Sequence, residues 1–177
     1  MQVTADGIAI IKHYESLHDG NLTKIGLQPK MCPAGYWTEG YGHIVRDKDG
    51  NPLKGLANKS LAEKSAECLT EADACKLLDE DIDDFSAQLK PLIHIFCSDV
   101  IFSACVSLAY NIGINAFTTS TVLREMNKGN KAVAANGFLL FNKATVDGKR
   151  VVLPGLVKRR QAERALFIGQ DYKKFFV

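Results

Sequence analysis

The spacing of apolar residues changes from alternating to helical near Thr70, and this change limits the folds open to the chain. Residues 36–43 alternate β-forming residues with glycine, and residues 47–52 are a cluster of turn residues. These features predict a small antiparallel sheet between about residues 22 and 57. From Thr70 onward the spacing becomes helical. The helices expected there cover residues 70–90, a stretch that begins at residue 98, and residues 119–128, 130–141 and 155–168.

Two further elements complete the expected fold. Residues 4–17 have the pattern of a short amphipathic helix, and an Asp-Gly pair predicts a tight hairpin at residues 146–151. The fold class is therefore α+β and mainly α. We expect one domain made of an N-terminal α/β lobe (1–69), a connecting helix (70–90) and a helical lobe (91–177), with a ligand-binding cleft between the lobes.

Composition and charge exclude several classes of protein. The net charge of +2 is too small for a surface that is basic throughout, so we expect no nucleic-acid partner. Residues 143–164 nevertheless hold seven basic and two acidic residues, either as a contact for an anionic polymer or as a solvated helix face. No stretch is long and apolar enough for a membrane span, so we expect no stable membrane insertion, and the N-terminus predicts no signal peptide.

The cysteines argue against a disulfide framework. The chain has five of them, without a Cys-x-x-Cys pair and without histidines at zinc spacing. We therefore expect no metal and no cofactor. Four of the five fall in stretches that we expect to be helical, where a free cysteine usually behaves as a small buried apolar residue.

Glu15 is the first candidate for chemistry. On a helix of about 3.6 residues per turn, Ile8, Ile11 and Glu15 fall within about 60° of one another, so the carboxylate lies inside the apolar stripe. Burial disfavours the charged form of a carboxylate, as a general acid working near neutral pH requires. The alternative is a glutamate at a frayed helix end that turns to solvent or pairs with an arginine. The helix pattern alone leaves both interpretations open.

The second informative stretch runs from Cys32 to His43 and contains the sequence GYWTEGYGH. Together with Glu15 in a first helix, it resembles the phage-type, T4-like lysozymes and endolysins. Later segments agree with this resemblance in the same order, namely SLAYNIG at 107–113, AF and ST within 116–121, and GLVKRRQAE at 155–163. The resemblance extends over roughly residues 7 to 168.

This resemblance implies a lysozyme-like fold and an activity. The enzyme would be a muramidase that hydrolyses the β-1,4 bond between N-acetylmuramic acid and N-acetylglucosamine and thereby lyses bacteria. The catalytic residues of the family carry over onto Glu15, Cys32 and Thr38. Glu15 would protonate the leaving oxygen, Thr38 would hold the attacking water, and Cys32 would activate or position that water. Inverting enzymes need about 6.5–9.5 Å between their catalytic groups so that water fits.

Substrate-binding residues follow from the same resemblance and from residue type. Trp37 and Tyr36 are candidates for stacking on sugar rings, or else for packing within the sheet. Asn111 matches a position that faces the sugar in the family, and its alternative role is that of a turn residue before Gly113. Arg159 is a further candidate, and it or its neighbour Arg160 is also expected to pair with Glu15.

Two features depart from the pattern of the family. The interval between Glu15 and Cys32 is longer than usual, so residues 18–30 are an insertion beside the site, and Glu39 stands where the family usually has an apolar residue. Because a thiol is mostly protonated at neutral pH, Cys32 is either a catalytic group or a packing residue. Asp19 or Glu39 is then the alternative carboxylate, although Glu39 should point away from Thr38 across the strand.

Three rival functions remain open from the sequence. A peptidase or amidase would use Cys32 as nucleophile and His43 as base. A lytic transglycosylase on the same fold would use Glu15 alone. A non-catalytic module would bind cell wall or nucleic acid through residues 143–164.

The favoured function implies partners and a location. The substrate is the glycan strand of peptidoglycan, and we expect a monomer. We also expect synthesis in the host cytoplasm, passage through a holin-type pore at lysis, and action in the periplasm or on the cell wall.

Overall fold

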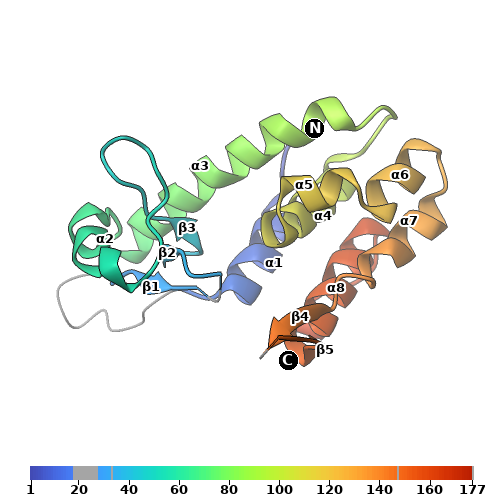
Figure 1. Cartoon of the computed structure of the whole chain (residues 1–177). Helices are drawn as coiled ribbons and strands as arrows, with labels where there is room; N and C mark the ends of the chain where they lie inside the picture. The colour runs from blue at the N-terminus through green and yellow to red at the C-terminus, as the bar shows by residue number, and fades with distance from the viewer. Residues whose placement is uncertain (18–27, 33, 147, 177) are drawn as a thin grey trace. The chain divides into compact units, whose positions relative to one another are not determined.

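The structure is a computed structural model that describes residues 1–17, 28–32, 34–146 and 148–176 (Figure 1). The chain divides into two compact units. Unit 1 consists of Met1–Tyr14 and Ile82–Val177, and unit 2 of Glu15–Asp81. Helix α3 (Glu71–Leu89) belongs partly to each unit, since the boundary falls within it.

Unit 1 is helical apart from one hairpin. Its other elements are α1 (Ala5–Glu15, whose last residue is assigned to unit 2), η2 (Lys90–Leu92), α4 (Asp99–Ile112), α5 (Ile114–Thr118), α6 (Thr121–Asn127), α7 (Lys131–Phe138), β4 (Lys143–Val146), β5 (Lys149–Val152), α8 (Pro154–Phe167) and η3 (Lys173–Phe175). The helices predicted at 98 onward, 119–128, 130–141 and 155–168 are thereby confirmed. The predicted hairpin is confirmed too, with Val146 paired to Lys149.

Helix α4 forms the core of unit 1. All residues from 102 to 109 are buried, as expected for a helix whose residues are apolar nearly all round. The Ser98 side chain caps its N-terminus by accepting a hydrogen bond from the Ile101 amide, and Gly113, at φ 84°, ends it. Local signals at both ends explain why the sequence located this helix.

The first helix packs against α4, which differs from the predicted lobe of residues 1–69. The Thr4 amide donates to Ser103 Oγ over 2.8 Å, and a Cβ added at Gly7 would come within 2.6 Å of Ser103 Cβ. Only glycine permits this close approach. Residues up to Tyr14 therefore belong to unit 1, because their packing partner is about a hundred residues away in the sequence.

Unit 2 is built on a three-stranded antiparallel sheet in the order β1 (Lys30–Met31), β2 (Trp37–Glu39), β3 (His43–Ile44). The register pairs Lys30 with Thr38 and Thr38 with Ile44. This confirms the predicted sheet for the described part of residues 22–57. The core beside it consists of Trp37, Val45, Leu53 and Ala62.

Unit 2 also contains two elements that the sequence did not predict, η1 (Leu56–Asn58) and α2 (Lys59–Ser65). Helix α2 buries only Ala62, so it has no apolar stripe to detect. The expectation that four cysteines are helical is also wrong. Cys68 and Cys97 lie in irregular segments, and their burial comes from tertiary packing.

No described helix is long and apolar enough to cross a membrane.

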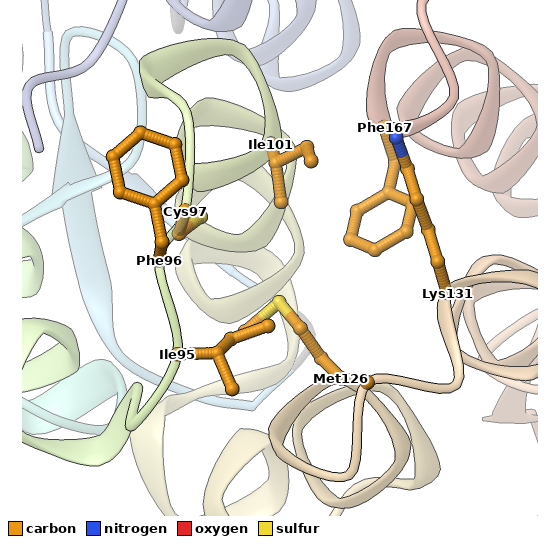
Figure 2. A pocket seen from close by; sticks show the side chains of 8 residues that line it. Ile95, Phe96, Cys97, Ile101, Met126, Lys131 and Phe167 are labelled. Carbon is orange, nitrogen blue, oxygen red and sulfur yellow. The ribbon is translucent and has the colours of Figure 1, made fainter.

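Unit 1 contains an apolar pocket of about 190 Å³, which Figure 2 shows between the 95–97 segment and the ends of α6 and α8. Its labelled side chains include Met126, Phe167 and, as the only charged one, Lys131. The residues that line this pocket include no carboxylate, so it offers no acid of the kind that a glycosidase uses.

Candidate active site

Glu15 is the last residue of α1 and is half-buried. The buried residues of the helix are Gly7, Ile10 and Ile11, so its buried stripe is centred differently from the predicted one. Glu15 lies at the edge of that stripe. The expectation that it lies inside the apolar stripe is wrong, because the face of the helix that packs closely against Ser103 of α4 carries Gly7 and not Ile8. Ser16 then leaves the helix at φ 57°.

Thr38 lies in the middle of β2 and is only 5% exposed. Its hydroxyl donates a hydrogen bond over 3.2 Å to the carbonyl oxygen of Lys30, its partner on β1. This bond uses the hydroxyl proton and fixes the side chain, while the oxygen keeps its capacity to accept a hydrogen bond. Thr38 can therefore orient a water molecule as an acceptor.

Cys32 directly follows β1 and extends its pairing. Its amide donates to the carbonyl of Tyr36 over 2.8 Å, and its carbonyl accepts from the amide of Gly35 over 2.8 Å. Residue 32 is two positions beyond Lys30, the partner of Thr38, and alternate residues of paired strands share a face. The register therefore places Cys32 and Thr38 on the same face, and the thiol is half-buried there.

Glu39 has a structural role. The carboxylate is 2% exposed, and Oε2 accepts hydrogen bonds from the amides of Glu67 at 3.0 Å and Cys68 at 2.8 Å. Oε1 is 3.2 Å from the same Glu67 amide. The carboxylate thus satisfies the backbone that leads into α3, and this use speaks against Glu39 as a catalytic base. Asp19, the other alternative, lies outside the described residues.

The two aromatic candidates differ. Trp37 belongs to the core of unit 2, at 5% exposure, and its indole Nε1 donates to the Gly55 carbonyl over 2.9 Å. Of the two roles predicted for Trp37, its enclosed ring favours packing within the sheet over stacking on a sugar. Tyr36 is half-buried, and Lys54 Nζ lies 4.7 Å from its ring centroid. Tyr36 remains a predicted sugar contact.

Asn111 and Arg159 both belong to unit 1. Asn111 is exposed at the end of α4, and its Oδ1 accepts a hydrogen bond over 3.0 Å from Arg160. It remains a predicted sugar contact, and it also borders a cavity of about 540 Å³ beside the β4–β5 hairpin. Arg159 is 2% exposed and pairs with Glu163 at 3.2 Å. Its predicted role in substrate binding and the predicted pairing with Glu15 stay predictions.

The sequence did not lead to a prediction for Glu163, the residue with which both arginines pair. Glu163 is fully buried between Arg159 and Arg160, the latter at 3.1 Å, and it accepts a hydrogen bond from Ser107 over 2.9 Å. These contacts join α8 to α4. The sequence did contain a signal for this cluster, because Glu163 follows the two arginines by three and four residues, and residues at this spacing are neighbours on a helix surface.

Unit 2 contains another interaction that the sequence did not predict, between His43 and Asp81. His43 Nδ1 is 3.0 Å from Asp81 Oδ1, and this hydrogen bond raises the pKa of His43 above its usual value of 6.5. The pairing connects β3 to α3 and employs His43 structurally. It therefore argues against the rival in which His43 is the base for a Cys32 nucleophile.

Comparison with known proteins identifies the family. The family model described as phage lysozyme matches residues 22–163. The chain belongs to the phage lysozyme family. As a phage lysozyme it is a peptidoglycan hydrolase, which confirms the predicted class of activity and the lysozyme-like α+β fold.

Individual relatives agree with this assignment. The endolysin of Acyrthosiphon pisum secondary endosymbiont phage 1 is 38% identical over 167 residues, 94% of this phage lysozyme and 98% of that protein. The endolysin of Salmonella phage P22 is 33% identical and covers 96% and 99% of the two chains.

Two solved structures are similar over nearly the whole chain. An endolysin from Escherichia coli O157:H7 phage FAHEc1 has a TM-score of 0.73 at 32% identity, and the comparison covers 95% of this chain and 94% of that one. The muramidase domain of SpmX from Asticaccaulis excentricus has a TM-score of 0.72 at 30% identity, with coverage of 94% and 97%.

Proposed function

We propose that this phage lysozyme is a muramidase that hydrolyses the β-1,4 bond between N-acetylmuramic acid and N-acetylglucosamine in one step, with a water molecule as the nucleophile. The observation that carries this proposal is the arrangement around β1 and β2. Cys32 and Thr38 share one face of the paired strands, and Thr38 is held as a hydrogen-bond acceptor. Glu15 belongs to the same compact unit.

Each residue has a separate task in this mechanism. Glu15 gives its proton to the glycosidic oxygen as the bond from that oxygen to the anomeric carbon breaks. Water attacks the opposite side of the same carbon, with one hydrogen directed to Thr38 Oγ, whose own proton is engaged by Lys30. The proton that the water loses passes to the group at position 32 or to solvent. Attack from the opposite side inverts the anomeric centre.

The acid is tested by Glu15→Gln. This variant keeps the shape of the side chain but cannot donate the proton, so we expect release of reducing ends from purified peptidoglycan to fall by a factor of about 10² to 10⁴. Glu63→Gln is the matched control, because Glu63 is an exposed glutamate on α2 of the same unit. Retention of lytic activity by Glu15→Gln would overturn the proposal.

The products separate this mechanism from a lytic transglycosylase. Hydrolysis leaves reducing N-acetylmuramic acid ends, whereas a transglycosylase leaves 1,6-anhydro ends, and mass spectrometry distinguishes them by one water molecule. Cleavage in ¹⁸O-labelled water should place the label on the anomeric carbon. Anhydro ends as the main product would remove Thr38 and the nucleophilic water from the mechanism.

The role of Cys32 is tested by comparing Cys32→Ser with Cys32→Asp. If the thiol takes part in activating water, the serine variant loses turnover and the aspartate variant retains it, because a carboxylate is a competent base. Equal activity of both variants and the parent enzyme would assign Cys32 to packing alone.

The endolysin relatives support a proposal for the cellular context. We infer synthesis in the host cytoplasm, release through a holin-type pore, and action as a monomer on glycan strands at the cell wall, supported by 33% identity to the P22 endolysin. Expression without a holin should leave cells intact until the membrane is permeabilised. Spontaneous lysis would refute release through a pore, and light scattering would measure the oligomeric state.

A further inference from the structure

The proposed catalytic acid lies at the end of α1, where a short helix by itself restrains a residue only weakly. The helix has 11 residues, Glu15 is the last of them, and Ser16 already has a left-handed φ of 57°. Short helices are marginal in isolation and fray at their ends. A general acid must nevertheless be held closely, because a small displacement of a reacting group lowers the rate severely. Something outside the helix must therefore restrain its last turn.

The restraint comes from residues 171–176, which we call the brace. At the last turn of α1, the Tyr14 hydroxyl donates a hydrogen bond over 2.7 Å to the carbonyl oxygen of Phe175. The His13 ring stacks on Phe176, with centroids 3.9 Å apart and an interplanar angle of 6°. The Tyr14 ring meets Phe176 edge-on at 5.8 Å. The two residues directly before Glu15 are thus both engaged.

The brace also contacts the first turn of the helix. The hydroxyl of Tyr172, a buried residue, donates to Asp6 Oδ1 over 2.7 Å. Tyr172 in turn packs edge-on against Phe176 at 5.5 Å. Asp6 and Tyr14 are eight residues apart, or about 12 Å along a helix at 1.5 Å per residue. The brace therefore spans most of α1.

The brace has a defined conformation of its own. The Lys173 amide donates to Asp171 Oδ1 over 2.9 Å, which starts the 3-10 turn η3. The Phe176 amide donates back to the Lys173 carbonyl over 2.9 Å. A segment that is already folded loses little further conformational entropy when it restrains α1.

The two tyrosines act as constant donors. Burial is the main cause that raises the pKa of Tyr14 to about 12, with the charge of Glu163 as the next cause. Burial also raises the pKa of Tyr172 to about 12, followed by its hydrogen bond to Asp6. Both hydroxyls therefore keep their protons throughout the neutral and mildly basic range.

We propose that the brace positions the catalytic acid, with Tyr14, Tyr172 and Phe176 as positioning residues that hold the last turn of α1 and thereby Glu15. The inference rests on the proposed function, since Glu15 matters here only as the acid. None of the three residues touches substrate in this scheme. They act on the rate through the order of the helix end.

The test combines kinetics with hydrogen exchange in the full chain. Tyr14→Phe removes the hydroxyl and keeps the ring, Phe176→Ala removes the stacking partner, and Phe176→Tyr restores an aromatic ring as a rescue. Phe96→Ala is the control for loss of an aromatic side chain, because Phe96 is 96% exposed and remote from α1 in sequence. Variants are assayed below their unfolding temperature, which is measured separately.

We expect kcat on peptidoglycan to fall roughly tenfold or more in Tyr14→Phe and Phe176→Ala, with KM changed less than about twofold. Amides of residues 12–15 should exchange faster in both variants, those of α4 should not, and Phe176→Tyr should recover kcat. An unchanged kcat, or a lower kcat without faster exchange at residues 12–15, overturns the brace. An inactive parent enzyme would instead refute the proposed function, and the exchange data would still decide whether the brace holds α1.

Discussion

Replacing Glu39 tests whether a buried carboxylate beside the site is structural. Its two oxygens accept hydrogen bonds from the amides of Glu67 and Cys68. Glu39→Gln turns one oxygen into an NH₂ group that faces amide donors, so at least one charge-assisted bond is lost. Such bonds are worth roughly 1.5–3 kcal/mol each, so we expect unfolding to cost about 2 kcal/mol less. That corresponds to a Tm about 4–8 °C lower for a chain of this length.

Glu39→Leu removes both acceptors. The loss of partners for the two amides outweighs the relief of the carboxylate's burial cost, so we expect a free energy of unfolding about 3 kcal/mol lower than that of the parent. Urea unfolding with an unchanged m-value measures both variants. Glu67→Gln, an exposed neighbour, is the control and should stay within about 0.5 kcal/mol of the parent. A Glu39→Leu protein as stable as the parent would refute the reasoning. Loss of turnover by folded Glu39→Gln would make Glu39 a catalytic group after all.

Three further outcomes are expected. Glu163→Leu removes the carboxylate that pairs with two buried guanidinium groups and should lower the free energy of unfolding in urea by about 3–5 kcal/mol, whereas an unchanged midpoint contradicts this. The hydrogen bond that the Asp81 carboxylate accepts raises the pKa of His43. The Tm difference between the parent and Asp81→Asn should therefore be full below pH 6.5 and vanish as the pH rises through the raised pKa, and a constant difference argues against this. Burial raises the pKa of Cys68 to about 11 and raises that of Cys105 well above its usual value. Neither thiol should therefore react with a thiol reagent at about pH 8 before the protein unfolds, and fast labelling would disprove this.

Local signals were sufficient for helices α4, α6, α7 and α8 of unit 1. Ser98 and Ser120 cap α4 and α6 with their own side chains, and both residues are recognisable in the sequence as N-caps. The apolar spacing between such signals then fixes each helix. No distant contact is needed for these predictions, which is why they succeeded.

The residues around the candidate site depend on distant contacts, and the predictions for them were weaker. Strand alternation places Thr38 and Glu39 on opposite faces, yet every residue of β2 is buried, because the segment before α3 covers Glu39. The same lack of information about distant contacts led to the prediction that Trp37 stacks on a sugar ring. Its enclosure requires Ala62, which lies on a helix that the sequence pattern did not indicate. Family resemblance, in contrast, predicted Glu15 as the catalytic acid without any knowledge of packing.

The place of α1 in unit 1 has a consequence for the timing of folding. Thr4 bonds to a residue 99 positions later, and Tyr14 to one 161 positions later. At roughly 5–20 residues per second, a ribosome needs about 8–30 s to add those 161 residues. During that interval the helix that ends in Glu15 has been made but its partners have not. A chain released early by a stalled ribosome would thus carry Glu15 without the packing partners of its helix, and lytic capacity should accumulate only with full-length product.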